Sequence, residues 1–394
     1  RRGRTLSDKI LVFCNQPIGI SETFIYHQIA GLRRYQAAIF GAKLLPEPRI
    51  QLNTYEVYLV NRGGLSGKIR EVELKLFGRV PPDAKRWIAA LCPALIHAHF
   101  VSYGAIALPI AQQFHLPLLV SAHGTDVTMH DAAIWRSSYL AHRIYLLRRR
   151  RLAQATSRLI VQSDFLRQIV IRRHGFKPEQ VVCIRHGINL GQFQADQCQP
   201  EHGHILYVGR LVARKGLPFL IEALAQLRDR FPDLHLTVIG DGPMRTSYEA
   251  LAKRVLGEQA TFLGAQPSAV VREYFQRAYA FCMPSITMPS GEAETLGVVF
   301  LEAMAMQVPP VSFASGGIPE VIRHGETGFL AAERNTAELA HYLGLLLENQ
   351  ALRDRMGEQG RRWVEQEFNL TAQNAKLEAL YDEVIAEHYQ LPSH

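Results

Sequence analysis

Two carboxylates and a polar loop stand out where an apolar run gives way to an expected helix. Residues 290–308 read Ser-Gly-Glu-Ala-Glu-Thr-Leu-Gly-Val-Val-Phe-Leu-Glu-Ala-Met-Ala-Met-Gln-Val, and apolar residues recur at helical spacing from Gly297 onward. Amides in the first turn of a helix can bind an anion, and a glycine lets a phosphate approach the backbone closely. The residues that would supply these amides are Gly297, Val298 and Val299. The loop therefore predicts an anion site.

Glu294 precedes this turn, and Glu302 follows eight positions later within the helix. On one continuous helix the two would stand roughly 12 Å apart along the axis, too far to act as an acid and base on one bond. We interpret them as contacts to the two ends of an elongated ligand with an anionic middle. A nucleotide sugar has this form, with its diphosphate on the amides, its ribose on Glu302 and its sugar on Glu294. The alternative is that both glutamates are solvated around an ordinary buried helix.

Two cations follow an expected strand at residues 205–208. Arg210 and Lys215 belong to the segment Gly-Arg-Leu-Val-Ala-Arg-Lys-Gly. At the carboxyl edge of a parallel sheet both could reach phosphates. The alternative is a basic surface loop, but a position on the same edge as Gly297 favours a shared diphosphate.

A histidine follows an expected strand in the first half of the chain. His123 begins the segment His-Gly-Thr-Asp and could contact a sugar hydroxyl, or its carbonyl could face positive charge at an anomeric carbon. A structural histidine is the alternative. Asp126 is a possible acceptor contact or a helix cap. A tight turn with Gly19 and Glu22 follows the first strand, and Glu22 is a second possible acceptor contact.

Short apolar runs alternate with helical patterns along the whole chain, which predicts an α/β protein with two doubly wound parallel sheets. The expected strands of the first half are 9–14, 36–42, 55–60, 94–100, 117–122, 158–162 and 181–185. Those of the second half are 205–208, 234–239, 261–263, 280–283 and 311–313, followed only by helices. We expect a domain boundary in the polar segment near residue 200, and ligand crevices at the carboxyl ends of the strands facing across one cleft.

The composition of the chain limits the classes of function that it can have. Residues 1–200 contain 27 Lys and Arg against 12 Asp and Glu, whereas residues 201–394 contain 17 against 24. The basic half suggests an anionic membrane surface, nucleic acid or a diphosphate substrate. Five widely spaced cysteines without a Cys-x-x-Cys pair predict reduced thiols in a cytoplasmic protein. No apolar run is long enough for a transmembrane helix, and no secretory signal is evident.

Two basic amphipathic stretches lie in this half. One is an expected long helix over residues 132–154, which ends in the basic run Arg148–Arg151, and the other covers residues 68–91. Both patterns are typical of a membrane surface, with a solvated helix face as the alternative. We therefore expect a protein on the inner face of the cell membrane, in contact with anionic lipid and not with nucleic acid.

The sequence lacks the motifs of several enzyme classes. The dinucleotide fingerprint Gly-x-Gly-x-x-Gly is incomplete at Gly240-Asp241-Gly242, and the Walker pattern is absent. An Asp-x-Asp pair, which would hold a divalent ion on a diphosphate, is also absent. We expect no cofactor and no metal, with Arg210, Lys215 and the helix amides neutralising the leaving group.

These motifs together resemble glycosyltransferase family 4, retaining enzymes of the GT-B fold with two Rossmann-like domains. The resemblance rests on Glu294-x7-Glu302, the Arg210–Lys215 loop, His123-Gly-x-Asp126 and Ser315-Gly-Gly-Ile-Pro-Glu. The segment Ser21-Glu-Thr-Phe near the start of the chain and the expected strand His97-Ala-His-Phe look most like the bacterial exopolysaccharide and lipopolysaccharide branch of the family. Many members carry a Gly-Gly pair in the first turn, whereas this chain has Ile18-Gly19.

The resemblance implies roles for individual residues. Glu294 would hold the donor sugar and Glu302 the ribose. Arg210 and Lys215 would bind the diphosphate, together with the amides from Leu296 to Val299. Ala265 would meet the base, Gly19 would approach the diphosphate, and His123 would contact the sugar near its 6-hydroxyl. It also implies domains at residues 1–200 and 201–370, with a last helix from about residue 371 crossing back onto the first.

We therefore expect a metal-independent retaining transferase that moves a hexose from a UDP-glucose-type donor to a lipid-linked or other membrane-associated glycan. A GDP-mannose donor is the next alternative. A nucleotide-sugar epimerase of the same fold and a nucleotide-sugar-binding protein without turnover remain open.

Overall fold

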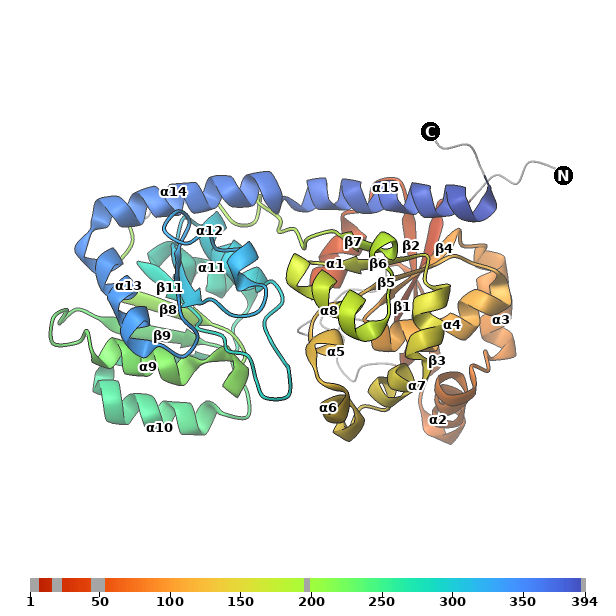
Figure 1. Cartoon of the computed structure of the whole chain (residues 1–394), viewed down its shortest axis with the longest axis horizontal. Coiled ribbons are helices and arrows are strands. Elements are labelled where there is room, and N and C mark those ends of the chain that lie inside the picture. The colour runs from red at the N-terminus through yellow and green to blue at the C-terminus, as the bar shows by residue number, and fades with distance from the viewer. Residues whose placement is uncertain (1–6, 16–22, 44–53, 195–198, 391–394) are drawn as a thin grey trace. The chain divides into compact units, whose positions relative to one another are not determined.

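The chain forms two compact α/β units, each built on a parallel sheet (Figure 1). The computed structural model describes residues 7–15, 23–43, 54–194 and 199–390. The first unit runs to His186 and resumes at Leu370, and the second is Gly187–Asn369. The chain thus changes units at Gly187 rather than near residue 200, because Ile188 and Phe193 are buried in the core of the second unit. The predicted fold class is confirmed.

The described residues of the first unit form a seven-stranded parallel sheet in the order β3-β2-β1-β4-β5-β6-β7. Its strands are β1 (Lys9–Cys14), β2 (Gln36–Lys43), β3 (Glu56–Asn61), β4 (Leu95–His99), β5 (Leu118–Ser121), β6 (Arg158–Val161) and β7 (Val181–Cys183). The central strands are apolar on both faces because helices cover both, and β4 is buried along its whole length. The order reverses beside β1, which places the loops after β1 and β4 at the switch point of the sheet.

The helices of the first unit follow the predicted alternation with one correction. They are α1 (Thr23–Ala30), α2 (Gly64–Val72), η2 (Glu73–Phe77), α3 (Pro82–Leu91), α4 (Val101–Phe114), α5 (Thr125–Thr128), α6 (Asp131–Arg136), α7 (Leu140–Ala155), α8 (Asp164–His174) and η3 (Pro178–Gln180). The single helix predicted over residues 132–154 is wrong, because Ser137 and Tyr139 between α6 and α7 are extended. The Ser137 hydroxyl accepts from the Tyr139 amide at 3.2 Å, an alternative to helical hydrogen bonding.

The last helix, α15 (Leu370–Tyr389), packs against the first unit. Leu377, Leu380 and Val384 share a buried cluster with Ile10 and Val12 of β1. The Glu378 carboxylate also accepts hydrogen bonds at 2.7 Å from the amides of Arg33 and Arg34. The C-terminal helix therefore completes the core on one face of the first sheet.

In the second unit, the part of the chain that the structure describes forms a six-stranded parallel sheet in the order β10-β9-β8-β11-β12-β13. Its strands are β8 (His204–Val208), β9 (His235–Ile239), β10 (Ala260–Gly264), β11 (Ala280–Cys282), β12 (Pro310–Phe313) and β13 (Phe329–Ala331). Its helices are η4 (Ala213–Lys215), α9 (Leu217–Ala225), α10 (Arg245–Leu256), η5 (Gly257–Gln259), α11 (Ser268–Arg277), α12 (Val298–Ala305), η6 (Ile318–Glu320), α13 (Thr336–Glu348) and α14 (Gln350–Glu367). The prediction of helices alone after residue 313 is wrong, because the short strand β13 pairs with β12.

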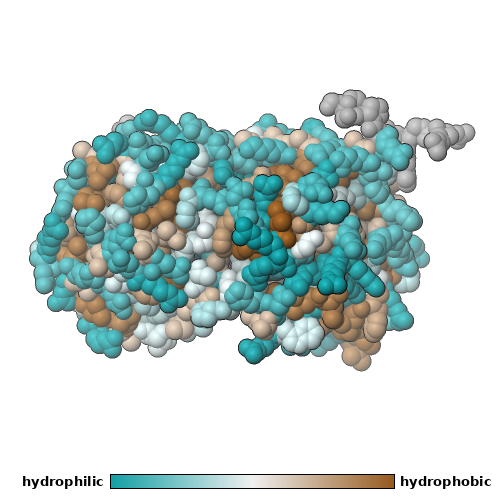
Figure 2. Space-filling view, in the orientation of Figure 1, coloured by the Kyte–Doolittle hydropathy of each residue, from teal (hydrophilic) through white to brown (hydrophobic). Residues whose placement is uncertain are grey.

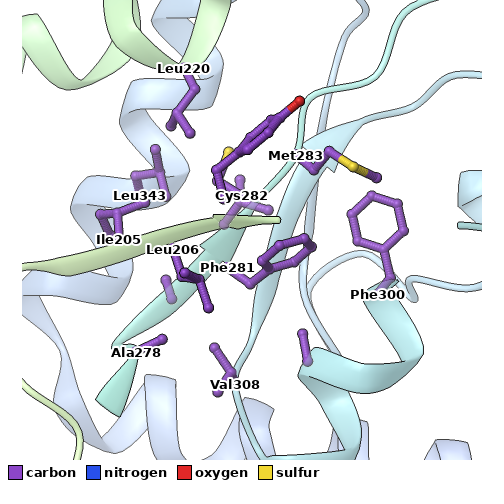
Figure 3. Close-up of a cluster of buried hydrophobic side chains, with 14 of the residues drawn as sticks. Ile205, Leu206, Leu220, Ala278, Phe281, Cys282, Met283, Phe300, Val308 and Leu343 are labelled. Atoms are coloured by element: carbon purple, nitrogen blue, oxygen red, sulfur yellow. The ribbon is translucent and has the colours of Figure 1, made fainter. Parts of the chain in front are cut away.

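Large apolar side chains anchor α12 to the second sheet. Figure 3 shows Phe281 of β11 and Met283, which directly follows this strand, beside Phe300 from the first turn of α12. The rings of Phe281 and Phe300 meet edge to face, with centroids 5.6 Å apart, and all three side chains are fully buried. This packing fixes the start of α12 beside the carboxyl end of β11.

Candidate functional site

Loops after four strands of the second sheet are joined at its carboxyl edge. Leu211 after β8 donates its amide to the carbonyl of Asp241 after β9, at 2.9 Å. Ile286 after β11 donates to the carbonyl of Arg214 at 2.8 Å. Gly317 after β12 donates to the carbonyl of Glu294 at 2.9 Å. Residues far apart in sequence are thereby held in one rigid loop cluster.

The centre of this loop cluster is the carboxylate of Glu294. Its Oε2 atom lies 2.5 Å from Nζ of Lys215 and 3.1 Å from Nη1 of Arg214. Burial acts to raise the pKa of Glu294, but the charges and hydrogen bonds of the two cations outweigh it and lower the pKa to about 2. Glu294 is therefore ionised at neutral pH.

Glycines allow the loops to approach so closely. Gly216 has φ 69°, and a Cβ atom there would lie 1.8 Å from the carbonyl oxygen of Pro284. Gly316 has φ 57°, and a Cβ atom there would lie 2.1 Å from the carbonyl oxygen of Glu294. A side chain at either position would push the backbone segments apart. The Lys-Gly and Ser-Gly-Gly motifs thus position Lys215 and Glu294.

The N-terminus of α12 lies directly after Glu294. Gly297 is its N-cap in the left-handed conformation, with φ 78°, and a Cβ atom there would lie 2.5 Å from the ring of Phe300. The amides of Leu296, Val298 and Val299 have no hydrogen-bond acceptor among the described residues. Free amides at a helix start carry partial positive charge, so this turn can bind an anion.

Glu302 lies one turn further along α12 and is half-buried. Burial raises the pKa of its carboxyl group to about 7, and the charge of Arg272 opposes the shift. Among described residues, no side chain or amide donates a hydrogen bond to this carboxylate. Glu302 therefore has acceptor oxygens available for hydroxyl donors, as a ribose contact requires.

Arg210 and Ala265 lie at the same edge of the sheet. Arg210 follows β8 and is exposed. Burial lowers the pKa of Lys215, and the charges of Arg214 and Arg210 act in the same direction. Ala265 is exposed and directly follows β10. The predicted residues of the second half thus gather at one edge. Arg214 was missed, although it belongs to the same motif as Arg210 and Lys215.

His123 lies in the first unit, after β5. Its Nε2 is 3.0 Å from Nδ1 of His99 at the end of β4, and its Nδ1 is 3.3 Å from Nε2 of His186 after β7. Burial lowers the pKa of His123 well below its usual value, and the charges of neighbouring histidines act in the same direction. His99 and His186 were missed, because sequence spacing does not show that the ends of β4 and β7 converge on His123.

Asp126 is buried, and its carboxylate binds backbone amides of the loop that contains His123 and of the start of α4. Its carboxylate accepts hydrogen bonds from the amides of Val101 at 2.9 Å, Gly124 at 2.8 Å and His123 at 3.2 Å. Burial raises its pKa to about 6, and these hydrogen bonds oppose the shift. Asp126 lies within α5, whose N-cap is Gly124 without a side-chain cap hydrogen bond, so it is not the cap of that helix. Its acceptor contact stays a prediction. The predicted contacts Gly19 and Glu22 lie outside the described residues.

One group of potential metal ligands occurs in the described part of the chain, formed by Glu201, His204 and His235. It lies at the amino ends of β8 and β9, opposite the loop cluster around Glu294. The two imidazole rings stack with centroids 4.5 Å apart and planes 13° apart. Lone pairs lie in the ring planes, so the two rings do not converge on one ion in this arrangement. Glu201 also pairs with Arg277 at 2.7 Å.

Two family models match consecutive parts of the chain. "Glycosyltransferase Family 4" matches residues 24–192, and "Glycosyl transferases group 1" matches residues 193–363. Among curated proteins, the glycogen synthase of Mycobacterium tuberculosis is 29% identical over 70% of this chain and 66% of its own length. A GDP-mannose-dependent phosphatidylinositol monomannoside mannosyltransferase of Mycolicibacterium smegmatis is 33% identical over 45% of this chain and 47% of its own. The amylovoran biosynthesis glycosyltransferase AmsK of Erwinia amylovora is 32% identical over 55% of this chain and 54% of its own length. The matches thus span less than two thirds of these relatives.

Solved structures resemble the whole chain in fold. Sucrose-phosphate synthase of Thermosynechococcus elongatus covers 96% of this chain and 99% of its own, with a TM-score of 0.76 and 21% identity. The Anabaena protein HepE was solved with UDP and glucose. Its match covers 94% of this chain and 98% of the HepE chain, with a TM-score of 0.74 and 20% identity.

Proposed function

Because this chain belongs to glycosyltransferase family 4, we propose that it transfers a hexose from a UDP-glucose-type donor to a lipid-linked or other membrane-associated glycan in polysaccharide biosynthesis. The observation that carries the proposal is the cluster of Lys215, Arg214 and Glu294 beside the free amides of α12. It combines a carboxylate for sugar hydroxyls with positive charge for a diphosphate.

The charge distribution suits a leaving diphosphate. Lys215 has three N–H donors, so it can hold Glu294 and a phosphate oxygen together. Arg210 is exposed beside it, and the amides of Val298 and Val299 add partial positive charge. These groups can stabilise the negative charge that develops when the sugar leaves, and we propose that no divalent ion is required.

The proposed reaction retains the anomeric configuration. The bond between the anomeric carbon and the phosphate oxygen breaks, and the acceptor oxygen bonds to the same face of that carbon. The acceptor proton passes to the departing phosphate oxygen, so that the products are the nucleoside diphosphate and the extended glycan. Glu294 would orient the sugar through its hydroxyls, and His123 would contact the sugar near the 6-hydroxyl.

The choice of base rests on the comparisons. HepE was solved with UDP and glucose, which supports a UDP-hexose. A GDP-mannose donor is the second candidate, because the M. smegmatis relative is named as GDP-mannose-dependent. The AmsK relative, named for amylovoran biosynthesis, supports a polysaccharide pathway. Calorimetric titration with UDP, GDP and ADP in EDTA tests the proposal: tight binding of UDP alone is expected, and binding of none would contradict it.

An exposed surface of the first unit supports a membrane-associated acceptor. Figure 2 shows hydrophobic residues gathered over α2, where Leu65 and Ile69 are exposed, and Phe77 of η2 is 66% exposed. On α7, Leu147 is 75% exposed. Arg148 of α7 donates to the carbonyl of Leu76 in η2 at 2.7 Å, so the two amphipathic stretches adjoin. We call the surface of α2, η2, α6 and α7 the basic amphipathic surface.

Within the basic run, only part of the charge is available to lipid. Arg148 donates to two backbone carbonyls, and Arg149 pairs with Asp131 at 2.8 Å. Arg150 and Arg151 are exposed and have no ion pair among the described residues. None of the described helices has the length and apolar composition to cross a bilayer. We propose that the chain lies on the inner face of the cell membrane, with Arg150, Arg151 and neighbouring apolar residues against anionic lipid.

A further inference from the structure

Three histidines at or after the carboxyl ends of different strands form a continuous hydrogen-bonded row in the first unit. His99, His123 and His186 are joined through facing nitrogens at 3.0 Å and 3.3 Å. Their ring planes differ by only 14° and 13°, while their centroids stand 5.2 Å and 5.3 Å apart. Because the facing nitrogens are far closer than the centroids, the rings meet edge to edge in nearly one plane. This is the geometry of linear hydrogen bonds between imidazoles.

Aromatic rings enclose this histidine row. Phe24 packs against His123 and His186, with centroids 4.8 Å and 4.5 Å away, and Phe100 packs against His123 at 4.7 Å. Burial lowers the pKa of His186 to about 4 and that of His99 well below its usual value. All three imidazoles are therefore neutral at neutral pH, and each carries one N–H and one bare nitrogen.

Neutral rings in such a row must share one direction of hydrogen bonding. If His99 donates through Nδ1, then His123 accepts at Nε2 and donates through Nδ1 to His186. If the direction is reversed, His99 carries its proton on Nε2. That atom is buried and has no hydrogen-bond partner among the described residues. A buried N–H without an acceptor is rarer than a buried acceptor without a donor, so the first direction is favoured.

We propose that His99 is a positioning residue that holds His123 as the Nδ1–H tautomer, with its proton directed to the side where His186 now lies. The inference rests on the proposed function at one point: a donor-sugar hydroxyl would replace Nε2 of His186 as the acceptor for this proton. The longer 3.3 Å contact to His186 is the one exchanged, and the 3.0 Å contact to His99 is kept. His123 thus presents a hydrogen-bond donor to the sugar.

Nitrogen NMR of the whole chain with ¹⁵N-labelled histidine tests the tautomer without any substrate. At neutral pH, His123 should show a protonated Nδ1 and a bare Nε2, and His99 a bare Nε2. In His99→Asn, the amide can still donate toward His123, so the tautomer should persist. In His99→Leu, the hydrogen-bond donor to His123 is lost, and His123 should become a mixture of its Nδ1–H and Nε2–H tautomers. A proton on Nε2 of His123 in the wild-type chain, or an unchanged tautomer in His99→Leu, overturns the proposal.

His97 offers a matched control on the same strand. It is equally buried, and its ring packs against that of His99 with centroids 4.4 Å apart. Its nitrogens contact the hydroxyls of Tyr381 at 2.7 Å and Ser121 at 2.8 Å, so it forms no hydrogen bond with the histidine row. His97→Asn should leave the His123 tautomer unchanged. A change as large as in His99→Leu would show that any loss of a buried histidine disturbs the site, and would overturn the specific role of His99.

Sugar-release kinetics provide the functional arm. His99→Leu should lower kcat by about tenfold or more with little change in KM, and His99→Asn should restore most of it. Equal losses in both variants would overturn the positioning role. If the wild-type chain releases no sugar from any donor, the proposed function fails, and the NMR result alone decides the tautomer.

Discussion

Nζ of Lys215 lies 2.5 Å from Oε2 of Glu294, and the same oxygen accepts a hydrogen bond from Arg214 at 3.1 Å. One carboxylate oxygen thus joins two cations. Residues 79 and 80 positions apart in sequence meet because the loops after β8 and β11 are hydrogen-bonded to each other.

Replacing Lys215 should weaken nucleotide binding more than replacing Arg214. Lys215→Met removes a cation that can hold Glu294 and phosphate together, so UDP affinity should fall by about 10- to 100-fold, as for loss of a hydrogen bond to a charged group. Arg214→Met should have a smaller effect. Lys253→Met, an exposed lysine of α10, is the control and should bind UDP like the wild-type chain. Calorimetric titration measures all three, and wild-type affinity in Lys215→Met would contradict its role.

Gly316→Ala should disrupt the site without unfolding the chain. A methyl group at 316 would lie 2.1 Å from the carbonyl oxygen of Glu294, so the backbone around Glu294 must move. Gly325→Ala is the matched control, because its φ of 78° is also left-handed but its Cβ atom would meet no atom within 4 Å. Both variants bear a conformational cost of about 1–2 kcal/mol. Only Gly316→Ala should lose donor hydrolysis, and equal activity in the two variants would contradict the argument.

Glu302 should make stability depend on pH. Its carboxyl group titrates at about 7 in the folded chain, against an ordinary value of 4.5. Between these pH values the folded state binds more protons than the unfolded state, so stability falls as pH rises from about 4.5 to 7. Glu302→Gln removes this loss, and its unfolding midpoint relative to wild type should be higher at pH about 8 than at pH about 5. Exposed Glu222→Gln on α9 is the control. If the unfolding midpoints of Glu302→Gln and the wild-type chain differ by the same amount at both pH values, the pKa of Glu302 is not raised by folding.

Neutralising Arg150 and Arg151 should weaken binding to anionic vesicles. Each basic residue near such a surface contributes about 1 kcal/mol, so the double glutamine variant should lose roughly tenfold or more in binding. Lys253 and Arg254 on α10 provide a control with the same change in charge. Co-sedimentation with vesicles containing phosphatidylglycerol measures the effect. Equal sedimentation of both double variants would remove these arginines from the membrane proposal.

The sequence predicted the architecture well where burial dominates. The strands of both sheets are apolar because helices cover both faces, so their runs are readable without the structure. The strand β13 was missed because the short apolar run Phe329–Ala331 suits a helix as well as a strand, and only its pairing with β12 distinguishes the two. The break between α6 and α7 was missed because it depends on hydrogen bonds of Ser137 that helical periodicity does not report.

The site was predictable only where its residues belong to one motif. Glu294, Gly297 and Glu302 occur within one segment, and their roles follow from a loop that leads into a helix. His99 and His186 are separated from His123 by 24 and 63 positions. Their contact arises from the order of strands in the first sheet, which no local pattern encodes.

Donor hydrolysis by the wild-type chain and by Glu294→Gln, measured in EDTA with UDP-glucose, UDP-galactose, GDP-mannose and ADP-glucose, tests the central claim most directly. Glutamine keeps the shape of the side chain but removes its charge. We predict that the wild-type chain releases glucose and UDP from UDP-glucose, whereas Glu294→Gln loses at least about 100-fold in rate and still binds UDP. Hydrolysis at the same rate in both proteins, or no release from any donor by the wild-type chain, would contradict the account.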